Sequence, residues 1–212
     1  GEEQKKMQAF LTSPEWKRTT AQGWGVNRAE TAEIFTANQM YIRKFPDRAA
    51  SLLGKLHCQH YGLPSFEKRL AAATREFVPF TGDPAGWFAQ NGRFTDFSGK
   101  TIELPERTFA THTSGKYTAA RVPLLDVIAE VLRQPDEVWL NNYDGKAFDC
   151  LNYIRFYRDK AINVVCRIEN GKTLAVRTWF EIAIRPTTRS GGKIAPEKDP
   201  RLKYRRGLLV KK

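Results

Sequence analysis

Apolar and polar positions alternate with a period of two in three consecutive runs, residues 152–157, 161–169 and 174–182. Each run is rich in β-branched and aromatic residues, which favour strands. The gaps between the runs are short and polar, and they read Arg158-Asp159-Lys160 and Asn170-Gly171-Lys172-Thr173. An Asn-Gly pair is favoured in hairpin turns. The pattern therefore predicts a three-stranded antiparallel meander.

If the alternation is strict, the side chains of this meander divide between two faces. One face is apolar and is expected to pack on a core. The other face collects polar, basic and aromatic side chains, namely Tyr153, Arg155, Tyr157, Asn163, Arg167, Arg177, Trp179 and Glu181. Guanidinium groups bind phosphate and aromatic rings stack on bases, so this face is a candidate RNA-contact surface. The alternative is an ordinary solvated sheet face.

Helical spacing predicts four short helices within residues 1–79, the last beginning at Leu63-Pro64-Ser65-Phe66. Residues 81–86 and 91–92 have the composition of loops, which places a domain boundary near residue 90. We therefore expect a helical N-terminal domain in residues 1–90 and a second domain in residues 91–212.

Outside the meander, the second domain has four further predicted elements. They are a hairpin at residues 94–97 and 101–104, a main helix at 121–132 that ends before Pro135, a strand at 136–140 and a closing strand at 207–210. The predicted fold class is α+β. It consists of a small N-terminal helical bundle followed by one main helix packed on a four- to five-stranded antiparallel sheet.

The net charge of +12 favours a polyanionic partner. Residues 185–212 alone carry 10 Lys and Arg against 2 Asp and Glu, a net charge of +8. This tail is expected to include a long loop at residues 186–200 and could close over RNA phosphates or remain a solvated terminus.

The three cysteines are irregularly spaced, which favours a reducing compartment such as the cytoplasm over a disulfide framework. No apolar run approaches the ~18 residues of a membrane span, so no membrane partner is expected.

Histidine has a pKa near neutral pH and is therefore a common general acid or base. The chain has three histidines. His57 and His60 are two ligands at helical spacing, which does not complete a zinc site. We expect them to be packed or exposed, and we expect no metal and no cofactor. His112 lies in a polar segment with Gly115 and Lys116, and it is the candidate catalytic histidine. Its alternative is an exposed loop histidine.

The sequence lacks the motifs of P-loop NTPases, Rossmann enzymes, zincins and α/β hydrolases, and its acidic residues are not paired for a two-metal nuclease. Cleavage of a phosphodiester without metal favours RNA, because the 2′-hydroxyl is a built-in nucleophile. The predicted catalytic residues are His112, Arg155, Arg177, Thr178 and Tyr204. The predicted substrate-binding residues are Lys116, Tyr153, Tyr157, Arg167, Trp179, Arg205 and Arg206. Thr178 is the weakest member, because alternation puts it on the apolar face unless a β-bulge redirects it.

Several short motifs follow one another in the second half, namely Glu103–Pro105, His112, Leu132–Trp139, Tyr153–Arg155, Ile162–Val165, Val176–Trp179 and Arg205–Val210. Together they resemble the phage-borne branch of the Barnase–EndoU–colicin–RelE-like nucleases, over roughly residues 100–212. Such domains occur at the C-terminus of Mu-type minor head proteins and among polymorphic bacterial toxins.

The resemblance implies a helix-plus-antiparallel-sheet fold and metal-independent RNA cleavage, commonly of tRNA by the toxin members. It also allows for a dedicated immunity protein as a partner. The family's motif histidine falls on His112 and its strand basic residue on Arg155. The strand pair usually written Thr-Thr falls on Arg177-Thr178, so a guanidinium replaces one hydroxyl.

The leading hypothesis is a toxin-like endoribonuclease that acts in a bacterial cytoplasm, either resident there or delivered from a virion. The main alternative is a non-catalytic phage head component that binds nucleic acid, capsid or portal protein through its basic face. A third interpretation is an inhibitor or adaptor whose helical half carries the interaction.

Overall fold

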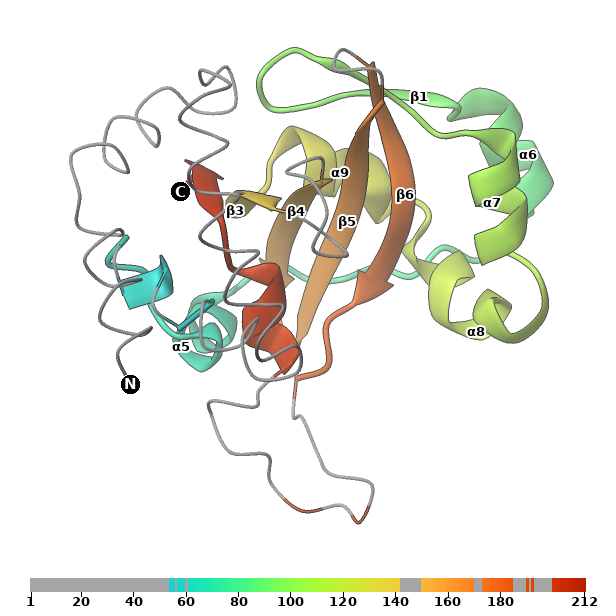
Figure 1. The fold of residues 1–212 in the computed structure, drawn as a ribbon. Helices are drawn as coiled ribbons and strands as arrows, with labels where there is room; N and C mark the ends of the chain where they lie inside the picture. Colours follow the sequence, from blue (N-terminus) through green and yellow to red (C-terminus); the bar gives the residue numbers. More distant parts are fainter. Residues whose placement is uncertain are drawn as a thin grey trace. The chain divides into compact units, whose positions relative to one another are not determined.

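The computed structural model describes residues 54, 55, 57–59, 61–141, 150–169, 173–184, 190, 192 and 200–212. The chain forms two compact units. Unit 1 combines residues 1–68, 139–149 and 185–212, and unit 2 combines residues 69–138 and 150–184. The predicted meander belongs to unit 2 (Figure 1).

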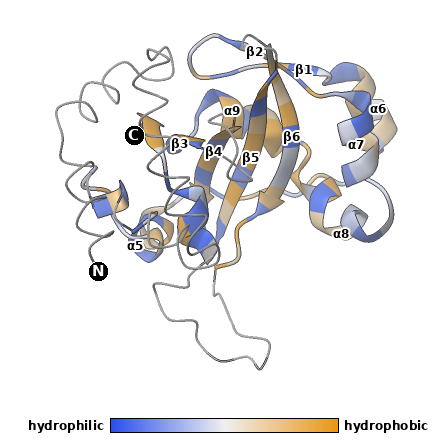
Figure 2. Cartoon of the chain, viewed as in Figure 1, coloured by the Kyte–Doolittle hydropathy of each residue, from blue (hydrophilic) through white to orange (hydrophobic). Residues whose placement is uncertain are grey.

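The three strands of the meander are confirmed as β4 (Cys150–Tyr157), β5 (Lys160–Glu169) and β6 (Thr173–Glu181). Bands of apolar and polar residues follow one another along them (Figure 2). Tyr157 pairs with Lys160, so the turn between β4 and β5 has two residues and not three. Asp159 in that turn has a φ of 59°, a conformation that Asp tolerates better than most residues.

The sheet is mixed, which corrects the antiparallel prediction. The predicted hairpin is confirmed as β1 (Arg93–Thr95) and β2 (Thr101–Glu103). However, β2 runs parallel to β6, with Ile102 beside Leu174 and Glu103 beside Ala175. A parallel pair needs a long crossover connection, and nothing in the local pattern of either strand reveals it.

Within unit 2 the strand order is β1-β2-β6-β5-β4, and β3 (Glu137–Asn141) begins beside β4. This β3 confirms the strand predicted at residues 136–140. Seven strands lie in the described part of the chain, where four or five were expected.

The predicted main helix is divided into three pieces. They are α8 (Thr118–Arg121), the 3-10 turn η3 (Val122–Leu124) and α9 (Val127–Arg133). Pro123 lies at the break, because proline has no backbone N–H to continue the helical ladder. The buried residues of α9 pack on β4 and β5, and the helix ends at Gln134 as the following proline predicts.

Two helices were not predicted from the sequence. In α6 (Pro84–Gln90), the carboxylate of Asp83 caps the helix by accepting a 2.7 Å hydrogen bond from the Gly86 N–H, and Pro84 takes the first helical position. The second helix, α7 (Glu106–His112), begins after Pro105, and a 3-10 turn, η2 (Gly115–Tyr117), follows it. His112 is therefore the last residue of a helix and not part of a loop.

The fourth predicted N-terminal helix is confirmed as α5, but Phe66–Ala72 ends earlier than expected. The other three predicted helices fall almost entirely on residues 1–53, 56 and 60, outside the described residues. The N-terminal bundle and the domain boundary near residue 90 therefore stay predictions. In the described part of the chain, no helix has the length and apolar character needed to cross a membrane.

In unit 1, the end of β3 lies beside β7 (Leu208–Lys211), which confirms the predicted closing strand. Gly207 precedes β7 with a φ of 96°, and a Cβ there would lie 2.1 Å from the carbonyl oxygen of Leu140. Only glycine fits this position. The Gly207 N–H donates a 2.7 Å hydrogen bond to Nδ1 of His57, which confirms that His57 is a packed histidine.

The β1–β2 hairpin turn is fastened to the meander by Asp96, a carboxylate that is only 4% exposed. Its oxygens accept hydrogen bonds from the backbone and hydroxyl of Ser98 at 2.8 Å and from the Lys100 N–H at 2.9 Å. The hydroxyl of Tyr153 on β4 donates a further bond of 2.9 Å. This contact joins the start of unit 2's sheet to its far strand.

We expect Tyr153→Phe to lower the free energy of unfolding by about 1–2 kcal/mol, because it removes a buried hydrogen bond to a carboxylate and leaves the ring in place. Urea denaturation measures the change. The exposed Val78 provides a control, and Val78→Ala should change stability by less than about 0.5 kcal/mol. Equal stability of Tyr153→Phe and the parent chain would contradict this role.

Candidate functional site

His112 is the last residue of α7, and its side chain contacts the backbone of β6. Its Nε2 lies 3.0 Å from the carbonyl oxygen of Arg177. Because a carbonyl only accepts hydrogen bonds, Nε2 carries the proton and Nδ1 is the basic nitrogen of the neutral ring. Nδ1 is buried and has no hydrogen-bond partner.

The strand β2 pairs with β6 only at Leu174 and Ala175. Beyond Ala175, side chains from other elements can therefore reach the backbone of β6. Further along, the register of β5 and β6 shifts, since Cys166 faces Val176 while Val165 faces Thr178. Arg177 is the extra residue of this β-bulge. The bulge leaves its side chain exposed and those of Thr178 and Trp179 buried. A bulge is therefore present beside Thr178, but Thr178 is buried opposite Val165 and its role as a hydroxyl donor stays a prediction.

Arg121 at the end of α8 makes a second contact with the same edge. Its Nη1 donates to the carbonyl oxygen of Trp179, and the indole Nε1 of Trp179 donates to the Arg121 carbonyl oxygen at 3.0 Å. The guanidinium also lies over two rings, 5.2 Å from the centroid of Phe180 and 6.0 Å from that of Tyr117. Arg121 is thus held on both its backbone and its side chain.

Aromatic rings enclose the imidazole. The centroid of His112 lies 5.3 Å from that of Trp179 and 5.8 Å from that of Tyr117, both edge to face. The Lys116 ammonium lies 5.1 Å from the Tyr117 centroid, and the Lys116 side chain is exposed. We call His112, Lys116, Tyr117, Arg121 and Arg177 the His112 cluster.

The electrostatics of the cluster favour an uncharged imidazole. Burial lowers the pKa of His112 from its ordinary value of 6.5. The hydrogen bond to the Arg177 carbonyl opposes this effect, while the positive charges of Arg121 and Arg177 lower the pKa further. At neutral pH the ring is therefore neutral and able to act as a base.

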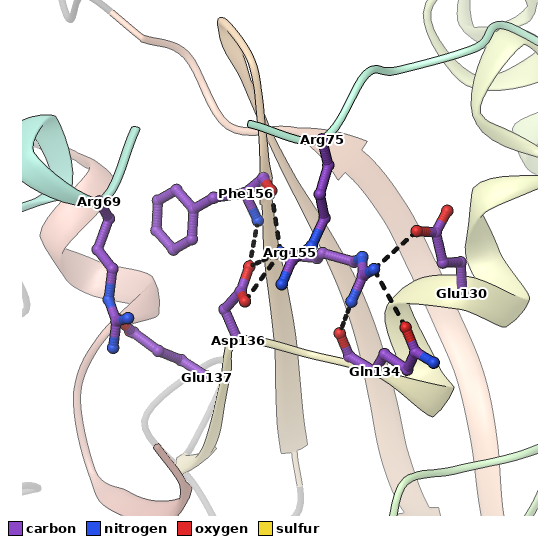
Figure 3. Close-up of polar contacts among 8 residues, drawn as sticks. All are labelled: Arg69, Arg75, Glu130, Gln134, Asp136, Glu137, Arg155 and Phe156. Atoms are coloured by element: carbon purple, nitrogen blue, oxygen red, sulfur yellow. Dashed lines mark hydrogen bonds and ion pairs between the residues drawn. The ribbon is translucent and has the colours of Figure 1, made fainter. Parts of the chain in front are cut away.

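Arg155 is placed elsewhere, on β4, which β5 separates from β6. Its guanidinium donates to the Gln134 carbonyl oxygen and pairs with Glu130 Oε1 at 2.8 Å (Figure 3). The side chain is only 5% exposed. It therefore anchors α9 to the sheet and does not face a substrate next to His112.

A second ion pair contacts β4 at Phe156, the residue after Arg155. Arg75 pairs with Asp136 at 2.7 Å, and the same carboxylate accepts a 2.8 Å hydrogen bond from the Phe156 N–H (Figure 3). The Arg75 carbonyl oxygen also accepts a bond of 2.7 Å from the Arg158 N–H. These contacts bind the segment after α5 to the end of β4.

The predicted basic and aromatic face does not exist as one surface. The two-residue turn pairs Tyr153 with Val164 and Ile154 with Asn163, so Tyr153 and Asn163 lie on opposite faces. A shift of one residue in register exchanges the faces of a strand. The bulge at Arg177 reverses the two faces of the sheet a second time, along β6. Both faces of β4 are buried, so its rings do not lie open to bases.

The predicted substrate-binding residues of unit 2 differ in whether their side chains are exposed. Tyr153 and Trp179 are fully buried and Tyr157 is 1% exposed, which excludes base stacking in this conformation. Lys116 and Arg167 are exposed, as binding residues need to be. Arg167 pairs with Cys150 and Ala175 in the ladder and is not part of the His112 cluster.

Three predicted residues belong to unit 1. Tyr204 ends the 3-10 turn η5 (Pro200–Tyr204) and lies beneath the Lys203 ammonium. Arg205 is fully buried, and its Nη2 donates to the Pro64 carbonyl oxygen at 2.8 Å. Arg206 is 5% exposed, and its carbonyl oxygen accepts from Asn141. The two arginines are therefore packed, which corrects the prediction of a basic tail open to phosphates.

Sequence reasoning missed Tyr117 and Arg121. Their spacing of four residues, which brings side chains together on a helical turn, was the one sign that the sequence carried. Among the residues that the structure describes, no three His, Cys, Asp or Glu side chains gather as metal ligands.

The comparison with protein-family models gives a match over residues 76–210, more than half of the chain. The matching model is the phage-Barnase-EndoU-ColicinE5/D-RelE like nuclease2 family, PBECR2. The chain belongs to this family. The resemblance seen in the sequence is thereby confirmed, and the His112 cluster lies within the matched residues. PBECR2 membership indicates a nuclease domain, an enzyme that acts on nucleic acid. Neither the curated proteins nor the solved structures contain a match.

Arg155 and Arg177 were predicted to be equivalent, so their effects on stability distinguish the predicted and observed arrangements. We expect Arg155→Ala to lower the free energy of unfolding by roughly 1–3 kcal/mol, because it removes a buried side chain together with its hydrogen bonds to Glu130 and the Gln134 carbonyl. Arg177→Ala, on an exposed side chain, should cost no more than about 1 kcal/mol. Equal losses in urea denaturation would contradict the burial of Arg155.

Proposed function

We propose that the chain is an endoribonuclease that cleaves RNA without a metal ion, at the His112 cluster. The observation that carries the proposal is the position of the His112 imidazole, bound to the Arg177 carbonyl and placed beside the Tyr117 ring of η2 and the cations of α8 and β6. Membership of the PBECR2 family supports nuclease activity. The RNA substrate and the metal independence are our inference from the chemistry.

In the proposed reaction, His112 accepts the proton of the RNA 2′-hydroxyl. The alkoxide then attacks the adjacent phosphorus, and the bond to the 5′-oxygen breaks to leave a 2′,3′-cyclic phosphate. The cations of Arg177 and Lys116, both exposed, stabilise the negative charge that grows on the phosphorane oxygens. The same positive side chains also attract the negatively charged backbone of RNA.

The departing 5′-oxygen needs a proton. His112 is the only histidine in the matched residues 76–210, so a pair of histidines in this segment does not share the two proton transfers. Either His112 returns the proton that it accepted, or a hydroxyl supplies it. Tyr117, whose ring contacts the imidazole, is the phenol of the cluster.

Substrate binding requires the imidazole to move. Nε2 is bound to the Arg177 carbonyl and Nδ1 is buried, so neither nitrogen is open in this conformation. In our proposal, RNA phosphates draw the Arg177 side chain and turn the ring away from the β6 edge.

Structured RNA, with tRNA first, is the substrate to test. We expect the protein to cleave it in EDTA and to leave 2′,3′-cyclic phosphate ends, and we expect His112→Ala to reduce the rate by about 10²–10⁴-fold. Gel electrophoresis of end-labelled tRNA measures cleavage. Arg107→Ala is the matched control, because Arg107 lies on the same helix with an exposed side chain. Loss of activity in EDTA, or full activity of His112→Ala, would sink the proposal.

The pH dependence provides a separate test. A base acts only when it is uncharged, so activity should fall as the pH decreases through the pKa of His112. Because that pKa is lowered in the folded protein, the acid limb should have its midpoint below 6.5. The dependence of kcat/KM on pH between 4 and 8, which reports the free enzyme, decides this. A midpoint above 6.5 would contradict the assignment of His112 as the base.

One observation favours a second candidate function. Since both ring nitrogens of His112 are engaged or buried, the same domain could bind nucleic acid or capsid protein as a non-catalytic phage head component. This alternative predicts salt-sensitive binding of RNA with no scission at any enzyme concentration.

A further inference from the structure

Beyond Ala175, two side chains bind backbone carbonyl oxygens of β6. β2 no longer pairs with β6 there, and the carbonyl oxygens of Arg177 and Trp179 turn outward. His112 donates to the first carbonyl and Arg121 donates to the second. The two donors therefore lie side by side on one edge, two residues apart along the strand.

Arg121 is fixed more firmly than His112. It donates to the Trp179 carbonyl and its own carbonyl accepts from the Trp179 indole at 3.0 Å, so two bonds link the same two residues. The guanidinium lies between the Phe180 and Tyr117 rings, which favour a flat cation over their faces. The Trp179 ring that Arg121 anchors is also one wall of the His112 site, at 5.3 Å.

We propose that Arg121 is a positioning residue for the reaction proposed above. It holds Trp179 and Tyr117 against the His112 ring and places a fixed positive charge beside that ring. This inference rests on the proposed function for its consequence in catalysis, but the physical effect on His112 can be measured without RNA.

The groups around the ring support a specific role for Arg121. The charged groups that act on His112 are Arg121 from α8 and Arg177 from β6, and the titratable Tyr117 from η2 contacts the ring. Arg177 is exposed, so solvent screens its charge, whereas Arg121 is partly buried and tied at both ends. Arg121 is therefore the more constant of the two cations.

The test is a ¹⁵N–¹H NMR titration of the full chain, with the His112 signal assigned by its loss in His112→Ala. In Arg121→Gln, the pKa of His112 should rise toward 6.5, because a nearby positive charge is removed. Arg121→Lys should keep the pKa low. Arg107→Gln removes an exposed charge from α7 and should leave the pKa unchanged. An unchanged pKa in a folded Arg121→Gln would overturn the inference.

If Arg121→Gln does not fold, Arg177→Gln answers the same question. The partly buried Arg121 then remains beside the ring, so Arg177→Gln should change the pKa of His112 only slightly, and a rise to 6.5 or above would overturn the inference. Activity separates the two proposals. A wild type that never cleaves RNA removes the proposed function, while the titration still decides the effect of Arg121. In an active enzyme, Arg121→Gln should shift the acid limb of the rate profile upward together with the pKa.

Discussion

The unpaired edge of β6 is the constraint on which the His112 cluster depends. A strand that loses its neighbour exposes carbonyl groups that still need donors. In this chain the imidazole of His112 and the guanidinium of Arg121 supply them. The same contacts place a histidine, an arginine and two aromatic rings within a small region. The chemistry of the site therefore follows from the way in which the edge is closed.

The sheet itself is an interior element and not a contact surface. Both faces of β4 are buried, and Arg155 and Tyr153 make hydrogen bonds with groups inside unit 2. Charged groups at such positions are satisfied by carboxylates and carbonyls, since an unpaired buried charge is costly. Other basic side chains of unit 2, such as Lys116, Arg167 and Arg177, are exposed. The net charge of +12 thus overstates the cationic surface of the described residues.

The residues matched by the family model, 76–210, include the whole His112 cluster. A nuclease needs a base and cations at one site. Burial and neighbouring positive charge keep the His112 ring uncharged at neutral pH. The hydrogen bond that holds the ring also blocks its donor nitrogen, so the resting arrangement is a closed one. Opening by an anionic substrate would couple binding to activation.

The sequence by itself determined the elements whose signals are local. Alternation located β4, β5 and β6, and Pro135 located the end of α9. The sequence also grouped His112 with Arg177, which the structure brings into contact, although it placed Arg155 with them. These signals are set by the preferences of a few neighbouring residues, and tertiary contacts did not override them.

Only the tertiary structure decided which side chains share a face. One residue fewer in the Arg158-Asp159 turn and one extra residue at Arg177 each reverse the parity of a strand. The sequence carries a sign of the second shift alone, because alternation puts the polar Thr178 on the apolar face. The parallel pairing of β2 with β6 is likewise a long-range choice. Because side-chain direction has a period of two, such shifts separate residues that the pattern had grouped.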